Sequence, residues 1–463
     1  MASPDFEPFE RKMRSEGLPE LAIRTFRHYY EKLVSGDRGT LSREQIDPVG
    51  EVPSAEAVAG AAEAGKAALE RTVVIKLNGG LGTSMGMTRA KSLLTVKDGL
   101  TFLDLICRQI LHLRERFGRP IPLLLMNSFR TREDSLAVLS RYGDLGAGLG
   151  ADFLQHKVPR IRSDDLSPID WPPARELEWC PPGHGDIYTA LVTSGMLEAL
   201  LRRGYRHAFV SNADNLGAVL DLDILGWFAS EGAPFAMEVK DRSEADRKGG
   251  HLARTKQGGL TLREIAQCPE EERESFEDIQ LYRYFNTNNL WLDLESLRDA
   301  LAERDSVLGL PMIRNQKSVD PGDPSSPRVI QLETAMGAAI SVFPGARAIR
   351  VPAHRFAPVK TTNDLMRIWS DAYVLSDDYR ILPAADGSAN GLVIDLDPAF
   401  YKRIGDFTER LPHGAPSLVR CRRLTVRGDF RFGKGVRVSG EVDLVDRSGT
   451  PTRIPDGTVL SSS

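Results

Sequence analysis

Residues 73 to 92 read VVIKLNGGLGTSMGMTRAKS, a short apolar run that breaks into glycines and ends near a lysine. The apolar part is typical of a buried strand, and glycines at positions 79, 80, 82 and 86 follow it. Glycines just past a strand let the backbone approach a ligand closely and point its N–H groups at anionic oxygens. Lys91 then supplies a point charge for a phosphate. The stretch predicts an anion-binding loop, and a glycine-rich turn without a ligand is the alternative.

The loop matches neither of two familiar phosphate-binding motifs. A Walker A loop needs GxxxxGK[ST], but Met85 and Ala90 occupy its two glycine positions. A dinucleotide fingerprint needs GxGxxG, and after Gly80 and Gly82 the third glycine comes one residue late, at Gly86. The missing third glycine disfavours a dehydrogenase on a dinucleotide-binding fold.

Strands and helices alternate on both sides of this loop. The patterns predict helices at 18–34 and 54–70, a strand at 72–77, a helix capped by Thr101, a strand at 121–126, a helix from Thr131, and strands at 207–217 and 234–242. This order implies parallel pairing and right-handed crossovers, which define an α/β sheet. Open sheets of this kind bind ligands at the carboxyl ends of their strands, where the glycine loop is expected.

Other segments predict hairpins, loops and a separate C-terminal part. Residues 251–265 predict a β-hairpin that turns at Gln257-Gly258-Gly259, and residues 319–328 predict a surface loop. The last sixty or so residues have short β runs between closely spaced glycines, which suit a few coils of a parallel β-helix or a small separate sheet. We therefore expect an N-terminal helical segment packed on the core (1–70), an α/β domain (71–385) and a C-terminal β domain (386–463).

The composition bounds the class of protein. A chain of 463 residues with 41% hydrophobic residues suits roughly two or three globular domains. A net charge of −4 argues against a general nucleic-acid or membrane-surface binder. The four cysteines form no CxxC pair, which favours free thiols in a reducing compartment and indicates no zinc site. Neither a secretory signal nor a long apolar run is apparent, so we expect a cytoplasmic protein.

Two polar clusters are candidates for nucleotide and metal binding. In WCPPGHGD, Gly183 and Gly185 flank His184, which would give a bare backbone surface with one donor side chain. A rigid Pro-Pro-Gly turn without a ligand is the alternative. Asp214 follows an apolar run in FVSNADNLG, where a carboxylate is well placed to hold Mg²⁺ shared with substrate phosphates. An Asx turn or a helix cap is the alternative there.

Two further clusters are candidates for sugar and phosphate binding. In RYFNTNNLW, three asparagines surround Thr287, and side-chain amides both donate to and accept from sugar hydroxyls. Asparagines in a turn are the alternative. Lys360 precedes a helix that Thr362 would cap, and helix N-termini attract anions. A solvent-exposed lysine is the alternative.

Taken together, these motifs resemble those of the eukaryotic-type UTP–glucose-1-phosphate uridylyltransferase family. That family carries LNGGLGTSMG-x-x-x-PKS, PPGHGD, SN-x-DNLG, FNTNNLW and F-x-PVKTT, and this sequence has LNGGLGTSMGMTRAKS, PPGHGD, SNADNLG, FNTNNLW and FAPVKTTNDL in the same order. The resemblance implies a glycosyltransferase-A-like, Rossmann-like nucleotidyltransferase core with a C-terminal left-handed parallel β-helix. It also implies Mg²⁺-dependent, reversible transfer of UMP from UTP to glucose 1-phosphate, giving UDP-glucose and pyrophosphate.

The resemblance carries roles over to single positions. It implies Lys91 and Lys360 as catalytic residues, Leu77, Gly79, Gly80, Gln155, Gly183 and Asp214 as nucleotide-binding residues, Asp214 as the metal ligand, and His184, Gly250, Glu264, Asn286 and Asn288 as sugar-binding residues. One departure concerns the loop, where Thr88-Arg89-Ala90 replaces the family's Lys-Gly-Pro. The basic charge moves by one place and the stiffening proline is lost.

Alternatives to this function stay open. The enzyme could act on another sugar 1-phosphate, such as galactose 1-phosphate or an N-acetylhexosamine 1-phosphate, or on several. A non-catalytic sugar-nucleotide binder is a different class, suggested by the altered 88–90 stretch. Retention of Lys91, Asp214 and Lys360 argues for an enzyme. The implied β-helix leaves both an end-to-end homo-oligomer and a monomer open, and we expect no nucleic-acid or membrane partner.

Overall fold

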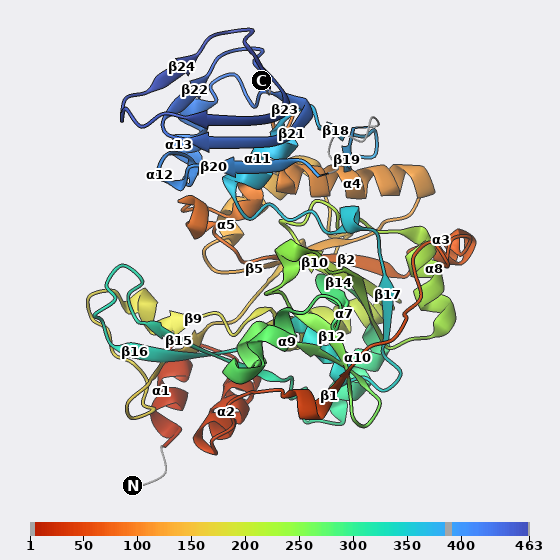
Figure 1. Cartoon of the computed structure of the whole chain (residues 1–463). Helices are drawn as coiled ribbons and strands as arrows, with labels where there is room; N and C mark the ends of the chain where they lie inside the picture. The colour runs from red at the N-terminus through yellow and green to blue at the C-terminus, as the bar shows by residue number, and fades with distance from the viewer. Residues whose placement is uncertain (1–4, 385–390, 462–463) are drawn as a thin grey trace.

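The computed structural model describes residues 5–384 and 391–461, and a mixed sheet lies at its centre (Figure 1). Its strands follow the order β1 (Ile46–Pro48), β12 (His251–Thr255), β14 (Tyr284–Asp293), β10 (His207–Asn212), β2 (Thr72–Asn78), β5 (Leu123–Asn127) and β6 (Asp152–Leu154). β10, β2, β5 and β6 are parallel, as their alternation with helices predicts. β14 is antiparallel to β10 and to β11 (Phe235–Asp241), so the predicted parallel sheet is in fact mixed.

The sheet extends beyond this central order at two places. β11 pairs in parallel with β17 (Arg347–Arg350). β12 pairs with β13 (Leu260–Arg263) in an antiparallel hairpin whose turn contains Gly258 at a φ of 93°. The predicted hairpin at 251–265 is therefore confirmed.

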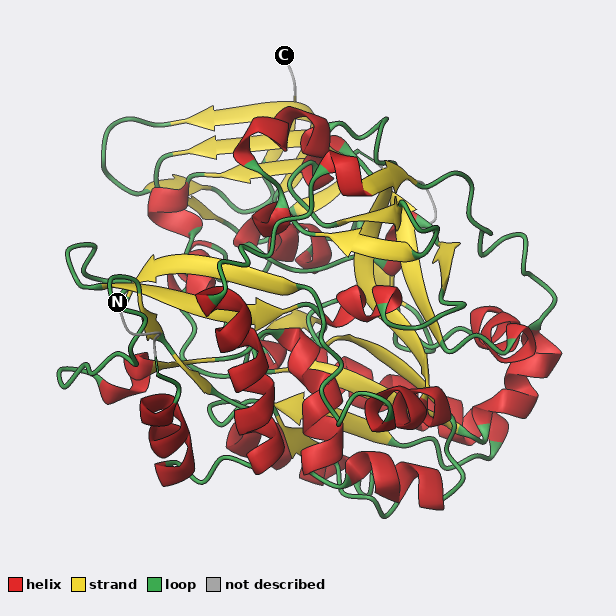
Figure 2. Cartoon of the chain, turned by 90° about the horizontal axis from the view of Figure 1, so that it is seen from below, coloured by secondary structure: helices red, strands yellow, loops and turns green. Residues whose placement is uncertain are grey.

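Helices cover both faces of the sheet because its strands are apolar on both sides. Val73 and Ile75 of β2 pack into one core with α6 (Ile187–Thr193), α7 (Met196–Arg202) and α10 (Leu294–Ala302). Val74, between them, points to the opposite face and packs with α3 (Ala62–Leu69), α4 (Phe102–Phe117) and α8 (Leu222–Glu231). Figure 2 shows the helices around the strands from below. Side chains alternate across a strand, so one uninterrupted apolar run serves both cores.

The helices begin and end where local chemistry dictates. Thr101 caps α4 as predicted, in a capping box with Asp104. The helix predicted at 18–34 is α2 (Glu20–Val34), and the one predicted from Thr131 is α5 (Arg132–Leu139). The alanine-rich stretch 54–70 is helical only from Ala62, because Gly60 has a φ of 103° that an α-helix excludes.

The N-terminal helices pack on a hairpin at one side of the core. α1 (Glu7–Ser15) and α2 share an apolar cluster with β15 (Met312–Ser318), β16 (Arg328–Thr334), β7 (Val158–Pro159) and β9 (Trp179–Cys180). β16 also pairs with β8 (Ile161–Arg162). The predicted loop 319–328 joins β15 to β16. Among the described residues, no helix has the length and apolarity needed to cross a membrane.

The C-terminal part is built from parallel strands, as predicted. β20 (Val393–Leu396), β21 (Ser417–Arg427), β23 (Arg437–Val445) and β25 (Val459–Ser461) form one parallel sheet, and β22 (Phe430–Phe432) and β24 (Thr452–Ile454) form another. They share a core with α11 (Thr362–Trp369), α12 (Pro398–Tyr401), α13 (Ile404–Arg410) and the start of α4 (Figure 1). The predicted boundary at 385/386 lies outside the described residues, and the division into three parts stays a prediction.

Two small sheets and one short helix complete the strands and α-helices of the described residues. They are the two-stranded sheets of β3 (Thr95–Lys97) with β4 (Leu100–Thr101) and of β18 (Tyr373–Leu375) with β19 (Ile381–Pro383), together with the single turn of α9 (Arg273–Glu277).

Candidate functional site

The glycine loop turns back on itself directly after β2. Gly82 and Gly86 have φ values of 64° and 74°, the left-handed region that side chains with a Cβ rarely adopt. The backbone N–H of Lys91 donates a 2.9 Å hydrogen bond to the carbonyl oxygen of Gly80. The loop therefore brings the side chain of Lys91 back over the carboxyl end of the strand from which the loop began.

An open cavity of about 750 Å³ lies over this loop. Its walls include all the residues assigned to the nucleotide, together with Lys91 and His184: Leu77, Gly79, Gly80, Lys91, Gln155, Gly183, His184 and Asp214. These residues come from five separate segments of the chain. The fold thus gathers this half of the predicted site at the carboxyl ends of parallel strands, where such folds bind ligands.

Lys91 and Asp214 meet inside the cavity. The Nζ atom of Lys91 donates to Oδ2 of Asp214 at 2.6 Å. Asp214 lies two residues past the end of β10, in a turn whose backbone pairs with the segment before Lys360, since the N–H of Val359 donates to the carbonyl oxygen of Asp214 at 3.3 Å. Within residues 5–384 and 391–461, no group of three or more His, Cys, Asp or Glu side chains is arranged to hold a metal ion. Asp214 and Glu176 are the acidic residues among the described cavity walls.

Gln155 and Gly183 form another wall of the cavity. The side-chain amide of Gln155 donates to the carbonyl oxygen of Gly183 at 2.9 Å. Gly183 has a φ of 80°, and a Cβ on it would lie 2.4 Å from the carbonyl oxygen of Thr334. No other residue fits at position 183 without moving β16.

His184 is held in one tautomer. Its Nδ1 accepts a 2.9 Å hydrogen bond from the backbone N–H of Met336, in a 3₁₀ helix that follows β16. Burial lowers the pKa of the His184 imidazole to about 4. The ring is therefore neutral near pH 7, with its proton on Nε2, and it can donate a hydrogen bond from that atom.

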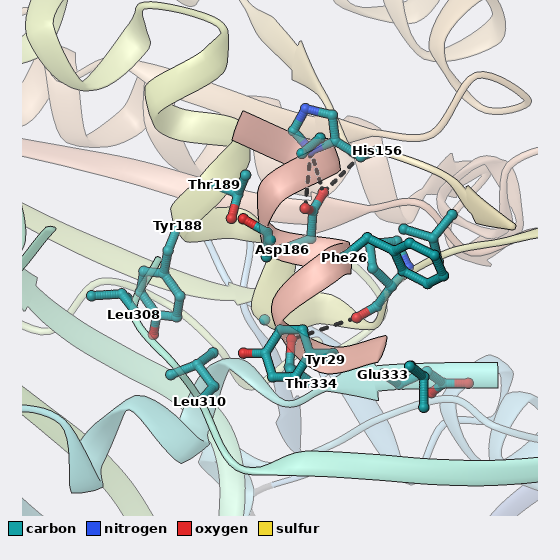
Figure 3. A pocket seen from close by; sticks show the side chains of 16 residues that line it. Phe26, Tyr29, His156, Asp186, Tyr188, Thr189, Leu308, Leu310, Glu333 and Thr334 are labelled. Carbon is teal, nitrogen blue, oxygen red and sulfur yellow. Dashed lines mark hydrogen bonds and ion pairs between the residues drawn. The ribbon is translucent and has the colours of Figure 1, made fainter. Parts of the chain in front are cut away.

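Asp186, two residues after His184, is held in place by His156. Figure 3 shows the Asp186 carboxylate pointing at His156, whose Nδ1 lies 2.9 Å from Oδ1 of Asp186. The backbone N–H of His156 also donates to Asp186, at 2.7 Å. A small second cavity of about 40 Å³ separates these residues from Phe26 and Tyr29 of α2. The N-terminal helix thus supports the back of the segment that carries His184.

Four of the five predicted sugar-binding residues form a second cluster, and His184 lies apart from it in the large cavity. The amide of Asn286 donates to Oδ1 of Asn288 at 3.0 Å, and the N–H of Asn288 donates back at 2.9 Å. Asn286 also donates its backbone N–H to the carbonyl oxygen of Gly250 at 3.0 Å. A Cβ on Gly250 would lie 2.6 Å from the carboxylate of Glu264. The four residues come together, but none of them is among the residues that line the large cavity.

A bulge in β14 shapes this asparagine cluster. The register with β11 shifts between Glu238 and Val239, which pair with Asn289 and Asn286, respectively. The two residues in between are left out of the ladder, and Asn288 adopts a φ of 57°. The bulge therefore re-aims the Asn288 side chain, a feature that the sequence pattern alone does not reveal.

The positive charge of Lys360 acts on Glu264 of the same cluster. Burial raises the pKa of Glu264 to about 7, and the positive charge of Lys360 opposes that rise. The residue that caps α11 is Thr361, through Asp364, and not the predicted Thr362. The backbone N–H of Lys360 donates to the same Asp364 carboxylate at 2.9 Å. The capping box thus fixes the start of the helix and orders the backbone of Lys360.

Arg89, in the stretch that departs from the family pattern, turns away from the cavity. Its guanidinium makes two hydrogen bonds with Asp134 in α5, at 3.0 and 2.5 Å. Arg89 is exposed and is absent from the cavity walls. In this structure it ties the glycine loop to α5 and does not take the place of a phosphate-binding lysine.

Some cavity residues escaped the sequence analysis: Phe129, Arg130, Lys157, Arg160 and Trp179. The ammonium group of Lys157 lies 4.6 Å from the ring centroid of Trp179 and 5.6 Å from that of Phe129. Phe129 is 57% exposed, which is unusual for a phenylalanine. Its position directly after a parallel strand is the signal that could have found it.

This fold and site define an α/β protein with an open cavity at the carboxyl ends of its parallel strands. A family model described as UTP–glucose-1-phosphate uridylyltransferase matches residues 23–439. The chain belongs to this family.

Curated relatives extend over most of the chain. UTP–glucose-1-phosphate uridylyltransferase from Solanum tuberosum is 42% identical over 399 residues, which cover 86% of this chain and 81% of the relative. The Saccharomyces cerevisiae protein of that name is 40% identical over 395 residues, with 85% and 78% covered.

Solved structures are similar over the whole fold. A mutant of UDP-glucose pyrophosphorylase from Leishmania major matches with a TM-score of 0.92 and 42% identity, covering 100% of this chain and 98% of that one. Another mutant of that protein, in complex with UDP-glucose, matches with a TM-score of 0.91 and 42% identity, covering 100% and 99%. UDP-glucose phosphorylase from Trypanosoma brucei matches with a TM-score of 0.87 and 41% identity, covering 98% and 99%.

Proposed function

We propose that this protein catalyses the reversible transfer of UMP from UTP to glucose 1-phosphate, giving UDP-glucose and pyrophosphate. The observation that carries the proposal is the pairing of Lys91 with Asp214 in a cavity floored by a glycine loop. Membership of the uridylyltransferase family and the likeness to a structure that holds UDP-glucose point to the same ligand.

The reaction needs little acid–base catalysis, but it needs strong stabilisation of the negative charge on the phosphates. A phosphate oxygen of glucose 1-phosphate attacks the α-phosphorus of UTP, and pyrophosphate leaves. The nucleophile is already an anion, so no general base is needed. The barrier lies in bringing two polyanions together and stabilising the crowded charge, which calls for positioning and fixed cations. We assign Lys91 to the triphosphate and Lys360 to the sugar phosphate and the reacting α-phosphate.

The remaining residues are assigned by where they lie. Leu77, Gly79, Gly80, Gln155 and Gly183 would bind the uridine from the cavity walls. His184 would donate from Nε2 to the sugar, because its Nδ1 is already occupied. Gly250, Glu264, Asn286 and Asn288 would hold the glucose hydroxyls. This arrangement requires the glucose to reach from the large cavity to the asparagine cluster, which does not line that cavity.

Asp214 is the proposed ligand of Mg²⁺. One carboxylate in an open cavity fits this ion, which prefers to keep several waters and to draw further oxygens from substrate phosphates. Lys91 already places one cation against that carboxylate, which supports the view that the position attracts positive charge. When bound, the ion would neutralise charge on the triphosphate.

Three further proposals concern the C-terminal fold, self-association and the cellular compartment. We propose that the two parallel C-terminal sheets are coils of a left-handed β-helix. Val445 and Val459, on β23 and β25, are exposed there, and we propose this end as a surface for self-association. We also propose the cytoplasm as the compartment, in keeping with four buried free cysteines.

A pyrophosphate-release assay tests the function. UTP and Mg²⁺ are incubated with glucose 1-phosphate, galactose 1-phosphate, N-acetylglucosamine 1-phosphate or no sugar. We expect the highest kcat/KM with glucose 1-phosphate and no release without a sugar. A clear preference for another sugar phosphate would replace glucose in the proposal, and release with none of them would overturn it.

A further inference from the structure

Asn215 follows Asp214 in the chain. Every hydrogen-bonding group of its side chain is used in contacts outside the cavity. Its side-chain amide donates to Oδ1 of Asn289 at 3.1 Å and to the carbonyl oxygen of Arg355 at 3.2 Å. Its side-chain oxygen accepts from the backbone N–H of Ala357 at 2.9 Å and from one further backbone N–H at 3.1 Å. An asparagine side chain has two donors and two acceptor sites, so all of them are satisfied.

Asn289 continues these contacts into the sheet. Its amide donates to Oε2 of Glu238 at 3.0 Å and to the carbonyl oxygen of Arg355 at 3.2 Å. The Glu238 carboxylate also accepts from Nε and Nη2 of Arg355, at 2.8 and 2.7 Å, and from the indole N–H of Trp291 at 3.0 Å. Glu238 and Asn289 are both wholly buried.

These contacts join three segments whose ends carry the proposed binding groups. Asn215 follows Asp214, and Asn289 follows Asn288 on the bulged strand. Arg355 begins the segment that reaches Lys360, and this segment forms an antiparallel bridge between Asn215 and Pro358. The covalent path from Asn215, Asn289 or Arg355 to a binding group is therefore five residues or shorter, and Glu238 joins the network from β11.

We propose that Asn215, Asn289, Glu238 and Arg355 form a positioning network that holds Asp214, the asparagine cluster and Lys360 in register. The roles of those three groups rest on the proposed function. All four network residues are buried, so they act through their neighbours and not on the substrate.

Stability alone does not account for such a network. A buried ion pair is often no more stabilising than apolar side chains of the same volume, because both ions must leave water. A fully satisfied buried network does, however, favour one arrangement over its alternatives. That property matters here because a displacement of about 1 Å at a reacting group can cost ~100-fold in rate.

Kinetics of Asn215→Ala and Asn289→Ala test the proposal. We expect the KM for glucose 1-phosphate to rise and kcat to fall, so that kcat/KM drops ~10- to 100-fold. Binding of UTP without Mg²⁺, measured by calorimetry, should change by less than ~3-fold, because the glycine loop and Gln155 follow β2 and β6, outside the network. Asp429→Asn is the matched control, since it breaks the buried Arg410–Asp429 pair of the C-terminal part. It should lower the thermal midpoint and leave both constants unchanged.

Each outcome bears on the proposal. Folded Asn215 and Asn289 variants with wild-type constants overturn it, and so does an equal loss of UTP and sugar-phosphate binding. If the alanine variants do not fold, Asn215→Ser is tested in the same way, and hydrogen exchange of the wild-type enzyme gives a second measurement. The amides of Ala357 and Val359, which donate to Asn215 and Asp214, should then exchange as slowly as those of β14, and rapid exchange overturns the proposal. Failure of the proposed function itself is distinct, because the wild-type enzyme would then form no UDP-glucose.

Discussion

The ammonium group of Lys91 lies 2.6 Å from the carboxylate of Asp214, although 123 residues separate them in the chain. They meet because β2 and β10 are adjacent parallel strands, with Leu77 opposite Asn212. The loops that follow these strands therefore leave the sheet at the same level. Each side chain is the partner of the other, and in the proposed reaction a triphosphate with its metal ion would separate the two.

Replacement of either lysine should abolish most of the activity. We expect Lys91→Ala and Lys360→Ala each to lower kcat/KM by at least ~100-fold, the scale typical of removing one group that stabilises developing charge. Lys66→Ala is the control, because Lys66 pairs with Glu63 on the surface of α3. Pyrophosphate release by the three purified variants measures the effect. Turnover of both active-site variants at the wild-type level would contradict the assignment.

Replacement of Asp214 distinguishes its proposed interaction with the metal ion from its interaction with Lys91. Asp214→Asn keeps the size of the side chain and removes its charge. The Mg²⁺ concentration for half-maximal activity should rise ~10-fold or more, because a carboxylate ligand is lost. UTP binding without metal should be unchanged or tighter, because Lys91 is freed and a negative charge near the triphosphate is gone. Weaker metal-free binding with an unchanged Mg²⁺ requirement would show that Asp214 holds no metal.

Two glycines of the cavity should respond differently to a methyl group. In Gly80→Ala the new Cβ meets no atom within 4 Å, so we expect an unchanged thermal midpoint and UTP binding weakened ~10-fold or more. In Gly183→Ala the new Cβ would lie 2.4 Å from a carbonyl oxygen at a φ of 80°, so a loss of about 1–3 kcal/mol in stability is expected. Thermal melting and calorimetric titration of both variants check this contrast. Equal melting temperatures would refute the geometric argument for Gly183.

Local sequence patterns account for much of the agreement between the predicted and the observed structure. Residues 73–75 are apolar and face both sides of the strand in turn, so a buried strand between two helix layers was predictable. The glycines after it predicted an anion-binding loop for the same local reason. Motif resemblance gathered the residues that now line one cavity, although no periodicity relates Gln155 to Gly183.

Non-local pairings account for most of what the sequence left open. Nothing in residues 284–293 indicates that β14 lies antiparallel between β10 and β11, because pairing direction depends on distant strands. The partner of Arg89 likewise depends on where α5 lies. The buried pair Glu238–Arg355 joins residues 117 apart, and neither residue stands in a recognisable motif.

Arg89 is expected to be a minor contributor to nucleotide binding. In Arg89→Ala the pair with Asp134 is lost, but Arg89 is exposed and such pairs contribute ~0–1 kcal/mol. The KM for UTP should therefore change by less than ~3-fold. Arg89→Glu, which repels Asp134, should have a larger effect through the position of the loop. Steady-state kinetics of both variants provide the measurement, and a loss of ~100-fold in Arg89→Ala would instead make this residue a direct phosphate ligand.

Glu264 should make the stability of the protein depend on pH. Burial raises its pKa from 4.5 to about 7, and Lys360 opposes the rise. Between these two values the folded protein keeps a proton that the unfolded chain has released, so the contribution of Glu264 to stability is lost as the pH rises through this window. Glu264→Gln has no such loss. The free energy of unfolding of the variant should therefore rise relative to that of the wild type between pH 4.5 and 7, by about 1–3 kcal/mol. Above that range the difference between the two proteins should stay constant.

Thermal unfolding of wild type and Glu264→Gln at pH 5, 6, 7 and 8 measures this difference. Glu63→Gln is the matched control, since Glu63 is exposed on α3 and should give a difference that is flat over this range. The Lys360→Ala background sharpens the result, because removal of that charge raises the pKa of Glu264 further and widens the window toward higher pH. A difference between Glu264→Gln and wild type that does not change with pH would mean that Glu264 ionises normally, and that Lys360 and the asparagine cluster face an ordinary, hydrated carboxylate.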